Sequence, residues 1–269
     1  MSDLWGLFSP SAGDLVPSSW GIFCLAVFIV GFSKTGLPGV TIVAVPLAAM
    51  VVPAKVSVGL MLPLYMAADL ISVLHYWRFA RRRCCFPYLV FVALGVWGAS
   101  FVVGAVDDRT FGVVIGGTVA TLVLLTVATD VVHRGKTAAP EPVETQNAQR
   151  GPSLVVSSFF GVTTGLFSAL SNAAGPITSI YMIIARLEKF QLLGTTAVCA
   201  FFMNWLKVPL FLSLGIINAR TLKLDLLAIP VIIPGCAAGV FFAKKLPQKA
   251  FKNVVLALAF LASLKLMLS

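Results

Sequence analysis

The chain has 269 residues, of which 59% are hydrophobic and 11% are charged, and its mean hydropathy is +0.97. These values exclude an ordinary soluble domain, and because a membrane-spanning helix needs about 20 apolar residues, the chain holds roughly ten spans and no separate catalytic domain. The formal net charge of +10 does not indicate a nucleic-acid partner, because the basic residues lie in short runs between apolar segments, where they set topology and contact membrane lipid.

The first nineteen residues carry Asp3 and Asp14 but no lysine or arginine. This is the wrong charge for the start of a signal peptide, so we expect the first apolar segment to be retained. The five cysteines are scattered without CxxC spacing and predict neither a disulfide framework nor a metal site. We also expect no cofactor.

Five apolar segments precede a polar stretch, and five follow it. The first five cover residues 20–32, 40–52, 56–77, 86–106 and 111–131. The last five cover residues 154–170, 177–185, 192–214, 222–243 and 254–268. The stretch between them contains prolines, glutamates and basic residues, which is typical of a flexible connector. We therefore predict an all-α polytopic membrane protein with an N-terminal repeat at 1–131, a cytoplasmic linker at 132–152 and a C-terminal repeat at 153–269.

The two halves share a short motif. The run Ser33-Lys34-Thr35-Gly36-Leu37-Pro38 aligns with Ser171-Asn172-Ala173-Ala174-Gly175-Pro176 at an offset of 138 positions. The same offset pairs Asp69 with Lys207. Weak internal symmetry of this kind is usual in transporters built from two repeats.

The distribution of charge predicts the topology. With the N-terminus outside, fourteen of the twenty basic residues fall on cytoplasmic connections, and Asp225 falls on an outer connection. This satisfies the positive-inside rule. Because five segments is an odd number, the second half enters the membrane in the opposite orientation, giving an inverted repeat with both termini outside.

The first two segments of each half are short for full spans. Each pair either crosses twice or forms a re-entrant hairpin whose tip lies at membrane depth, and we favour the hairpin. Irregular backbone at that depth is tolerated only where protein or a water-filled cavity satisfies it. The hairpin alternative therefore makes the two tips a binding site.

The tips carry residues suited to an anion. Ser33, Lys34, Thr35 and Gly36 supply hydroxyl, ammonium and backbone donors at a helix start, and Ser171, Asn172 and Gly175 occupy the matching places. The alternative is that the small residues only allow tight helix packing, as at Gly235 with Gly239. We favour anion binding for the first tip and leave both interpretations open for the second.

Asp69 and Lys207 lie inside long apolar segments, where a charge costs roughly 2.5 to 3.5 kcal/mol. The functional hypothesis makes Asp69 a proton-coupling carboxylate and Lys207 an anion-binding group. The alternative is a structural ion pair or snorkelling. The predicted depths of the two residues differ by roughly 10 Å, so a direct pair would need Lys207 to reach far.

Three stretches resemble the sulfite exporter TauE/SafE family of membrane permeases: GFSKTGLPGVTIVAVPLAAM at 31–50, the residues from Asp69 to Arg83, and NWLKVPLFLSLGIIN at 204–218. The resemblance covers nearly the whole chain. It implies transport of small sulfur-containing anions such as sulfite, thiosulfate or organosulfonates, and it supports Ser33, Lys34, Asp69 and Lys207 as motif positions.

We therefore expect a proton-coupled secondary transporter in the cytoplasmic membrane, whose partners are a small anionic substrate and membrane lipid. A passive anion channel and a non-transporting membrane scaffold stay open as alternatives. An enzyme is not expected, because the chain contains neither HExxH nor GxSxG. The sequence leaves the cargo, the transport direction, the coupling ion and the oligomeric state open.

Overall fold

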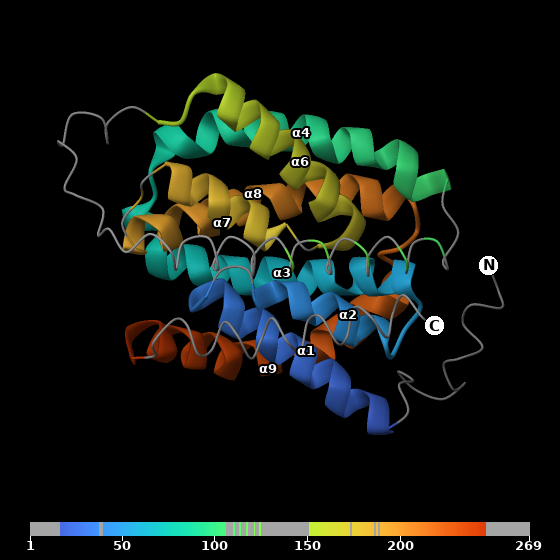
Figure 1. Cartoon of the computed structure of the whole chain (residues 1–269). Helices are drawn as coiled ribbons and strands as arrows, with labels where there is room; N and C mark the ends of the chain where they lie inside the picture. Colours follow the sequence, from blue (N-terminus) through green and yellow to red (C-terminus); the bar gives the residue numbers. More distant parts are fainter. Residues whose placement is uncertain are drawn as a thin grey trace.

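The computed structural model describes residues 17–37, 40–105, 151–172, 174–185, 187 and 189–245, together with single positions between 110 and 124. Every regular element within these ranges is a helix (Figure 1). The all-α prediction is therefore confirmed for the described residues. The tenth predicted segment, most of the fifth, most of the linker and both termini lie outside them.

The helices of the first half follow the predicted segments closely. They are α1 (Pro17–Thr35), the 3-10 turn η2 (Val40–Val43), α2 (Ala44–Ala49), α3 (Ala54–Tyr76), the 3-10 turn η3 (Trp77–Phe79) and α4 (Arg82–Ala105). The helices of the second half are α6 (Leu154–Ser171), α7 (Gly175–Ile184), α8 (Lys189–Ser213) and α9 (Ala219–Lys245). The bounds of α1, α3 and α4, displaced by 138 positions, match those of α6, α8 and α9 to within three residues.

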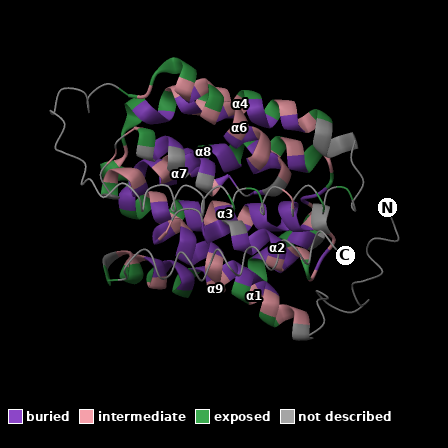
Figure 2. Cartoon of the chain, viewed as in Figure 1, coloured by how far each residue is buried: buried purple, intermediate pink, exposed green. Residues whose placement is uncertain are grey.

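Among the described residues, four helices are long and apolar enough to cross a membrane, and they cover Val56–Phe79, Arg82–Phe101, Phe190–Ser213 and Thr221–Ala243. Their burial differs: 61% of the apolar window in α3 is buried inside the protein, against 28% in α9. Figure 2 shows the buried residues concentrated on the central helices and exposed residues along the outer sides of α4 and α9. Since the exposed side chains of these outer helices include many large apolar ones, the protein is a membrane protein with α3 at its centre.

The helices pair across the two halves. α4 packs along α6 on one side of the molecule, α1 packs along α9 on the other, and α3 and α8 lie between them (Figure 1). Glycines allow both outer pairs to approach closely, because a Cβ at Gly95 would lie 2.2 Å from the Val162 carbonyl oxygen and one at Gly235 would lie 2.4 Å from that of Phe28. The predicted packing role of Gly235 and Gly239 is confirmed.

α1 and α2 form a hairpin that runs beside α3. The turn between them contacts the second half of α3. The Tyr65 hydroxyl donates to the Thr41 carbonyl (3.4 Å), the Ser72 hydroxyl to that of Lys34 (2.8 Å) and the Tyr76 hydroxyl, at the last residue of α3, to that of Thr35 (2.9 Å). The ten residues of η2 and α2 are about 15 Å long at 1.5 Å per residue, half of the roughly 30 Å hydrocarbon thickness. These lengths fit the hairpin alternative, and the ten residues of α7 fit it equally well.

α3 and α8 lie antiparallel. Asp69 on α3 contacts Asn204 on α8. Gly59, ten residues before Asp69, faces Ile216, which comes twelve residues after Asn204. Moving back along α3 thus corresponds to moving forward along α8 and the residues that follow it. The middle parts of the two long helices therefore face each other at the centre of the molecule.

The prediction that Asp225 belongs to an outer connection is wrong. α9 begins at Ala219, and the Asn218 side chain caps it by accepting the Thr221 N–H (3.2 Å). Asp225 consequently lies one to two turns inside the helix and is 2% exposed. The apolar segment predicted at 222–243 begins three residues after the start of the helix and already contains Asp225, so its bounds did not support the assignment of Asp225 to a connection.

Candidate functional site

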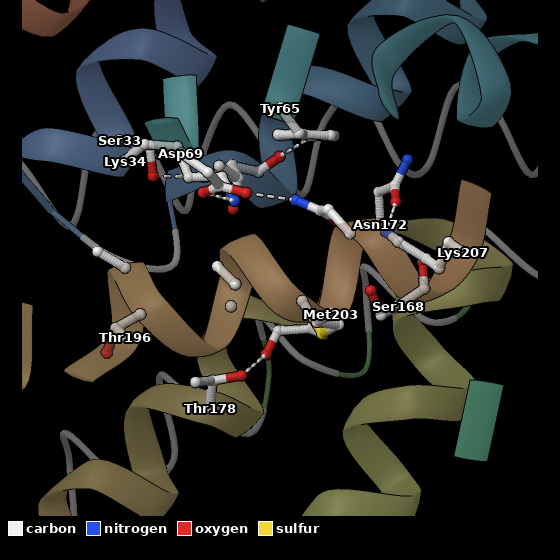
Figure 3. A pocket seen from close by; sticks show the side chains of 16 residues that line it. Ser33, Lys34, Tyr65, Asp69, Ser168, Asn172, Thr178, Thr196, Met203 and Lys207 are labelled. Carbon is white, nitrogen blue, oxygen red and sulfur yellow. Dashed lines mark hydrogen bonds and ion pairs between the residues drawn. The ribbon is translucent and has the colours of Figure 1, made fainter. Parts of the chain in front are cut away.

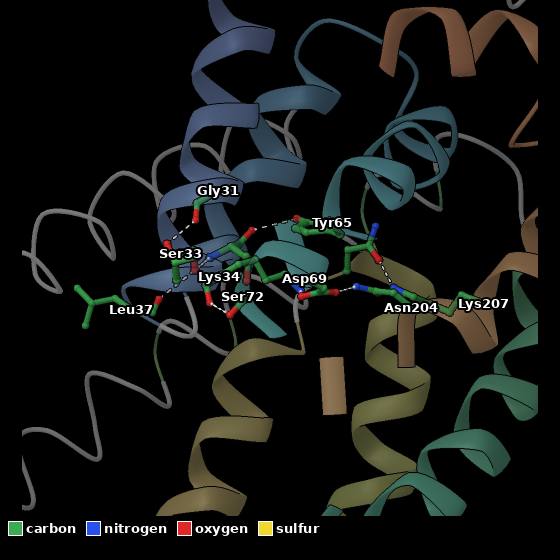
Figure 4. Close-up of polar contacts among 12 residues, drawn as sticks. Gly31, Ser33, Lys34, Leu37, Tyr65, Asp69, Ser72, Asn204 and Lys207 are labelled. Carbon is green, nitrogen blue, oxygen red and sulfur yellow. Dashed lines mark hydrogen bonds and ion pairs between the residues drawn. The ribbon is translucent and has the colours of Figure 1, made fainter. Parts of the chain in front are cut away.

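One serine side chain fixes the conformation of the turn after α1. The Ser33 hydroxyl donates to the Leu37 carbonyl and accepts the Thr41 N–H, both at 2.9 Å (Figure 4). A side chain thus satisfies backbone groups that the end of α1 leaves without helical partners. The two bonds fix the path of the chain from α1 into η2 and leave the Lys34 side chain directed toward α3.

Lys34, which is partly buried, forms an ion pair with the fully buried Asp69, with 2.6 Å between Nζ and Oδ1. Asp69 is fully buried and also accepts a hydrogen bond from the Asn204 amide (2.5 Å). The Lys34 ammonium lies 5.1 Å from the centre of the Tyr65 ring, whose face attracts a cation. The carboxylate therefore has an ammonium and an amide as partners, which offsets the cost of burying its charge.

Lys207 is accommodated differently. Its Nζ donates to the Asn172 side-chain oxygen (2.5 Å) and approaches the Ser168 carbonyl (3.4 Å). Asn172 has a left-handed φ of 51° at the end of α6, a conformation that asparagine tolerates better than most residues. Its amide nitrogen donates to the Val58 carbonyl (2.9 Å). That bond fixes the amide so that its oxygen faces the lysine.

The contacts of the two lysines occupy equivalent positions of the two halves. Displacing Lys34 and Asp69 by 138 positions gives Asn172 and Lys207, so one tip-to-helix contact occurs twice with different side chains. The first half places the cation on the tip and the anion on the long helix. The second half places a neutral amide on the tip and the cation on the long helix.

These groups surround a cavity of about 50 Å³ between the hairpin tips, α3 and α8. In Figure 3, Lys34 and Asp69 lie on one side of the view and Lys207 and Ser168 on the other. Because one water-sized group needs about 10–15 Å³ of such space, the cavity fits about four non-hydrogen atoms. Two lysines and one aspartate line it, so its walls carry a net charge of +1 when all three are ionised. The cavity suits a small anion.

One face of α8 forms a wall of this cavity. Positions three or four apart contribute Thr196, Ala200, Met203 and Lys207. The wall is apolar in the middle and polar at both ends. Two buried hydroxyl oxygens of the lining, Ser168 Oγ and Thr196 Oγ1, have no hydrogen-bond partner in the described part of the chain, and such groups are costly unless a ligand or water satisfies them.

The structure brings most of the predicted site residues together. Those that line the cavity are Ser33, Lys34, Asp69, Asn172, Gly175 and Lys207. Thr35 instead faces α9, where its hydroxyl donates to the Cys236 carbonyl (2.8 Å). The N–H of Gly36 closes the last turn of α1 by donating to the Phe32 carbonyl (2.9 Å). The side chain of Ser171 lies outside the described residues.

Sequence reasoning missed several lining residues, among them Tyr65, Ser168, Thr196 and Asn204. Two had a usable signal. Asn204 precedes Lys207 by three residues and Ser168 precedes Asn172 by four, which are the helical spacings that place side chains on one face. Within the described ranges, no group of three or more histidine, cysteine, aspartate or glutamate side chains is placed to hold a metal ion.

Comparison with known proteins identifies the family. No curated protein and no solved structure matches the chain. The model of one family, described as sulfite exporter TauE/SafE, matches residues 23–266, a range that begins within α1 and includes both hairpin tips and the four long apolar helices named above. The chain therefore belongs to the sulfite exporter TauE/SafE family, a family of membrane transporters of sulfur anions.

Proposed function

We propose that the protein is a secondary transporter that moves a small sulfur-containing anion, such as sulfite, thiosulfate or an organosulfonate, across the cytoplasmic membrane in step with protons. The observation that carries the proposal is the cavity between the hairpin tips, lined by Lys34, Lys207 and Asp69 and sized for about four non-hydrogen atoms. A desolvated anion at membrane depth needs positive charge beside it, and the two lysines supply it. Family membership supports the sulfur-anion class of cargo.

The proposed architecture is an inverted repeat of 1–131 and 153–269 around a cytoplasmic linker at 132–152, with both termini outside. The matching helix bounds, the antiparallel α3 and α8 and the recurring tip contact support it. In such carriers the cargo sits near the midplane, where the repeats meet, and one repeat moves against the other to alternate access. The cavity described above occupies that place between the halves.

Proton coupling follows from the ion pair. When Asp69 takes up a proton, its negative charge disappears and the Lys34 ammonium loses its counterion. An anion that enters then restores the balance of charge beside Lys34. One proton and one negative charge would thus be carried in the same direction, with Asp69 as the proton-coupling residue.

The experiment that tests the function is counterflow in vesicles reconstituted with the full-length protein. Vesicles loaded with unlabelled sulfite should accumulate labelled sulfite above its external concentration, because a carrier exchanges one anion for another. A passive channel would equilibrate the label without accumulation. A membrane scaffold would give the same uptake as empty vesicles, so either result would contradict the proposal.

A further inference from the structure

The two lysines of the cavity differ in what balances their charge. Lys34 contacts a carboxylate, Asp69, at 2.6 Å. The bonds that Lys207 makes within the described part of the chain go to neutral oxygen atoms, those of the Asn172 side chain and the Ser168 carbonyl. Lys207 is nevertheless 1% exposed. A buried ammonium without an anionic neighbour in contact is the stronger attractor for an anion from outside.

Lys207 also has donor capacity left. An ammonium group has three N–H donors, and two of them are directed at the Asn172 and Ser168 oxygens. The third is available to a ligand. Lys34 differs in charge and not in donor number, because Asp69 Oδ1 already balances the charge of its ammonium.

A second donor lies beside Lys207. The Ser168 residue is 1% exposed, its hydroxyl has no partner among the described residues, and it lines the same cavity. Because its carbonyl is within 3.4 Å of Lys207 Nζ, the hydroxyl and the ammonium belong to the same corner of the cavity. Figure 3 shows Ser168 and Lys207 next to each other there.

Asn172 keeps this corner in place. Its amide nitrogen is bound to the Val58 carbonyl (2.9 Å) on α3, which leaves the amide oxygen to hold the Lys207 ammonium. An amide oxygen is an acceptor and offers nothing to an anion. Asn172 is therefore a positioning residue, and at this corner of the cavity Lys207 and Ser168 are left to donate to an anion.

We propose that Lys207 Nζ and Ser168 Oγ form the docking site of the cargo in this conformation, where they donate to two oxygen atoms of one oxyanion. The preferred ligand class is a compact anion with at least two oxygen acceptors on one sulfur atom, such as sulfite or a short sulfonate. Lys34 stays paired with Asp69 until the proton arrives. This inference rests on the proposed function and deepens it, because it divides docking and coupling between the two lysines.

The test is equilibrium binding of labelled sulfite to the purified full-length protein, with bromide as a spherical competitor. Ser168→Ala should weaken sulfite binding at least tenfold, because a charge-assisted hydrogen bond is lost, and should change bromide competition less than threefold. The matched control is Ser157→Ala on the same helix. Ser157 is also fully buried, but its hydroxyl is already paired with Tyr181 (3.0 Å), so sulfite affinity should stay within threefold of wild type.

The division between the lysines is tested in the same assay. Lys207→Met should weaken sulfite binding at least tenfold more than the charge-neutral double variant Lys34→Met/Asp69→Asn. If Ser168→Ala binds sulfite as the wild type does, or if the double variant is the weaker binder, the docking site is overturned while the proposed function stands. If the wild-type protein binds none of sulfite, thiosulfate and methanesulfonate, the proposed function itself fails.

Discussion

Asp69 is the side chain on which the coupling hypothesis depends, because it contacts both halves of the protein. It pairs with Lys34 from the first hairpin and accepts a hydrogen bond from Asn204 on α8. Its protonation state therefore affects the contact of the hairpin tip with α3 and the contact between the two long helices. Replacing Asp69 with asparagine removes the charge but keeps the size of the side chain, so any change in transport can be assigned to the charge and not to a lost volume.

Asp69→Asn should uncouple anion flux from the proton gradient. In wild-type vesicles, a proton gradient directed inward should speed anion uptake, because the proposed coupling moves proton and anion together. In the variant, uptake should proceed at the same rate with and without the gradient, since the amide cannot take up the proton. Labelled sulfite uptake at two external pH values measures this, and uptake that still follows the gradient would rule Asp69 out as the coupling residue.

Lys34→Ala should destabilise the protein as well as stop transport. Removing one partner of a buried ion pair leaves a buried charge uncompensated and typically costs about 3–5 kcal/mol. The double variant Lys34→Met/Asp69→Asn should recover most of that loss, because no charge is left unpaired. Thermal unfolding in detergent compares the three proteins, and equal melting temperatures for both variants would show that the pair is solvated.

Charged and neutral site residues differed in how well the sequence predicted them. Lys34, Asp69 and Lys207 stood out because a charge inside an apolar segment is costly and therefore rare. Ser168 and Asn204 carried only the weaker signal of their helical spacing from Asn172 and Lys207, since a serine or asparagine in a helix carries little cost by itself. The Lys34 contact with Asp69 also went unpredicted, because the depth of the hairpin tip was not fixed by the segment lengths.

Among the helices, α8 combines a long apolar span with one wall of the cavity. Ala200 lies in the apolar middle of that wall. Ala200→Leu should fill much of the 50 Å³ cavity and abolish sulfite binding, with an overpacking cost of about 1–3 kcal/mol. Ala237→Leu on α9, where the side chain is exposed, is the control and should bind sulfite normally. Binding in Ala200→Leu equal to that of the control would place the cargo elsewhere.

The packing of α4 against α6 requires a glycine at position 95 but not at position 98. A Cβ at Gly95 would lie 2.2 Å from the Val162 carbonyl oxygen, whereas one at Gly98 would make an ordinary 3.6 Å contact with the Leu166 side chain. Gly95→Ala should therefore destabilise the protein by about 1–3 kcal/mol. Gly98→Ala should leave the melting temperature nearly unchanged. Equal effects of the two changes would contradict this account of the helix crossing.

For the molecule as a whole, each half depends on the other for its main helix contacts. α1 packs on α9 and α4 packs on α6, so the outer pairs each join one helix from each half. We expect residues 1–140 and residues 141–269 to be degraded when expressed separately and to assemble when expressed together. Detergent-stable protein from either part alone would show that a half folds independently.

The sequence predicted the helices well and their partners poorly. Apolar segment length and the 138-residue offset located α1, α3, α4, α6, α8 and α9 to within a few residues. The cross-half pairing was not predicted, because glycines such as Gly95 and Gly165 permit close approach without indicating which helix approaches. The start of α9 was misplaced, since a polar N-terminal turn with Asn218 as its cap lacks the apolar signal.

The unequal hairpin tips have a consequence for the rates of movement in the two directions. The first tip carries Lys34 and the second carries Asn172 at the equivalent position. An anion that enters past the first tip would therefore meet a different electrostatic potential from one that enters past the second. In the proposed alternating-access cycle, the two access states should then differ in free energy, and the inward and outward half-cycles should have unequal barriers even at equal driving force. Transport should therefore be faster in one direction than in the other, and the substrate affinity measured on one face of the membrane should differ from that measured on the other.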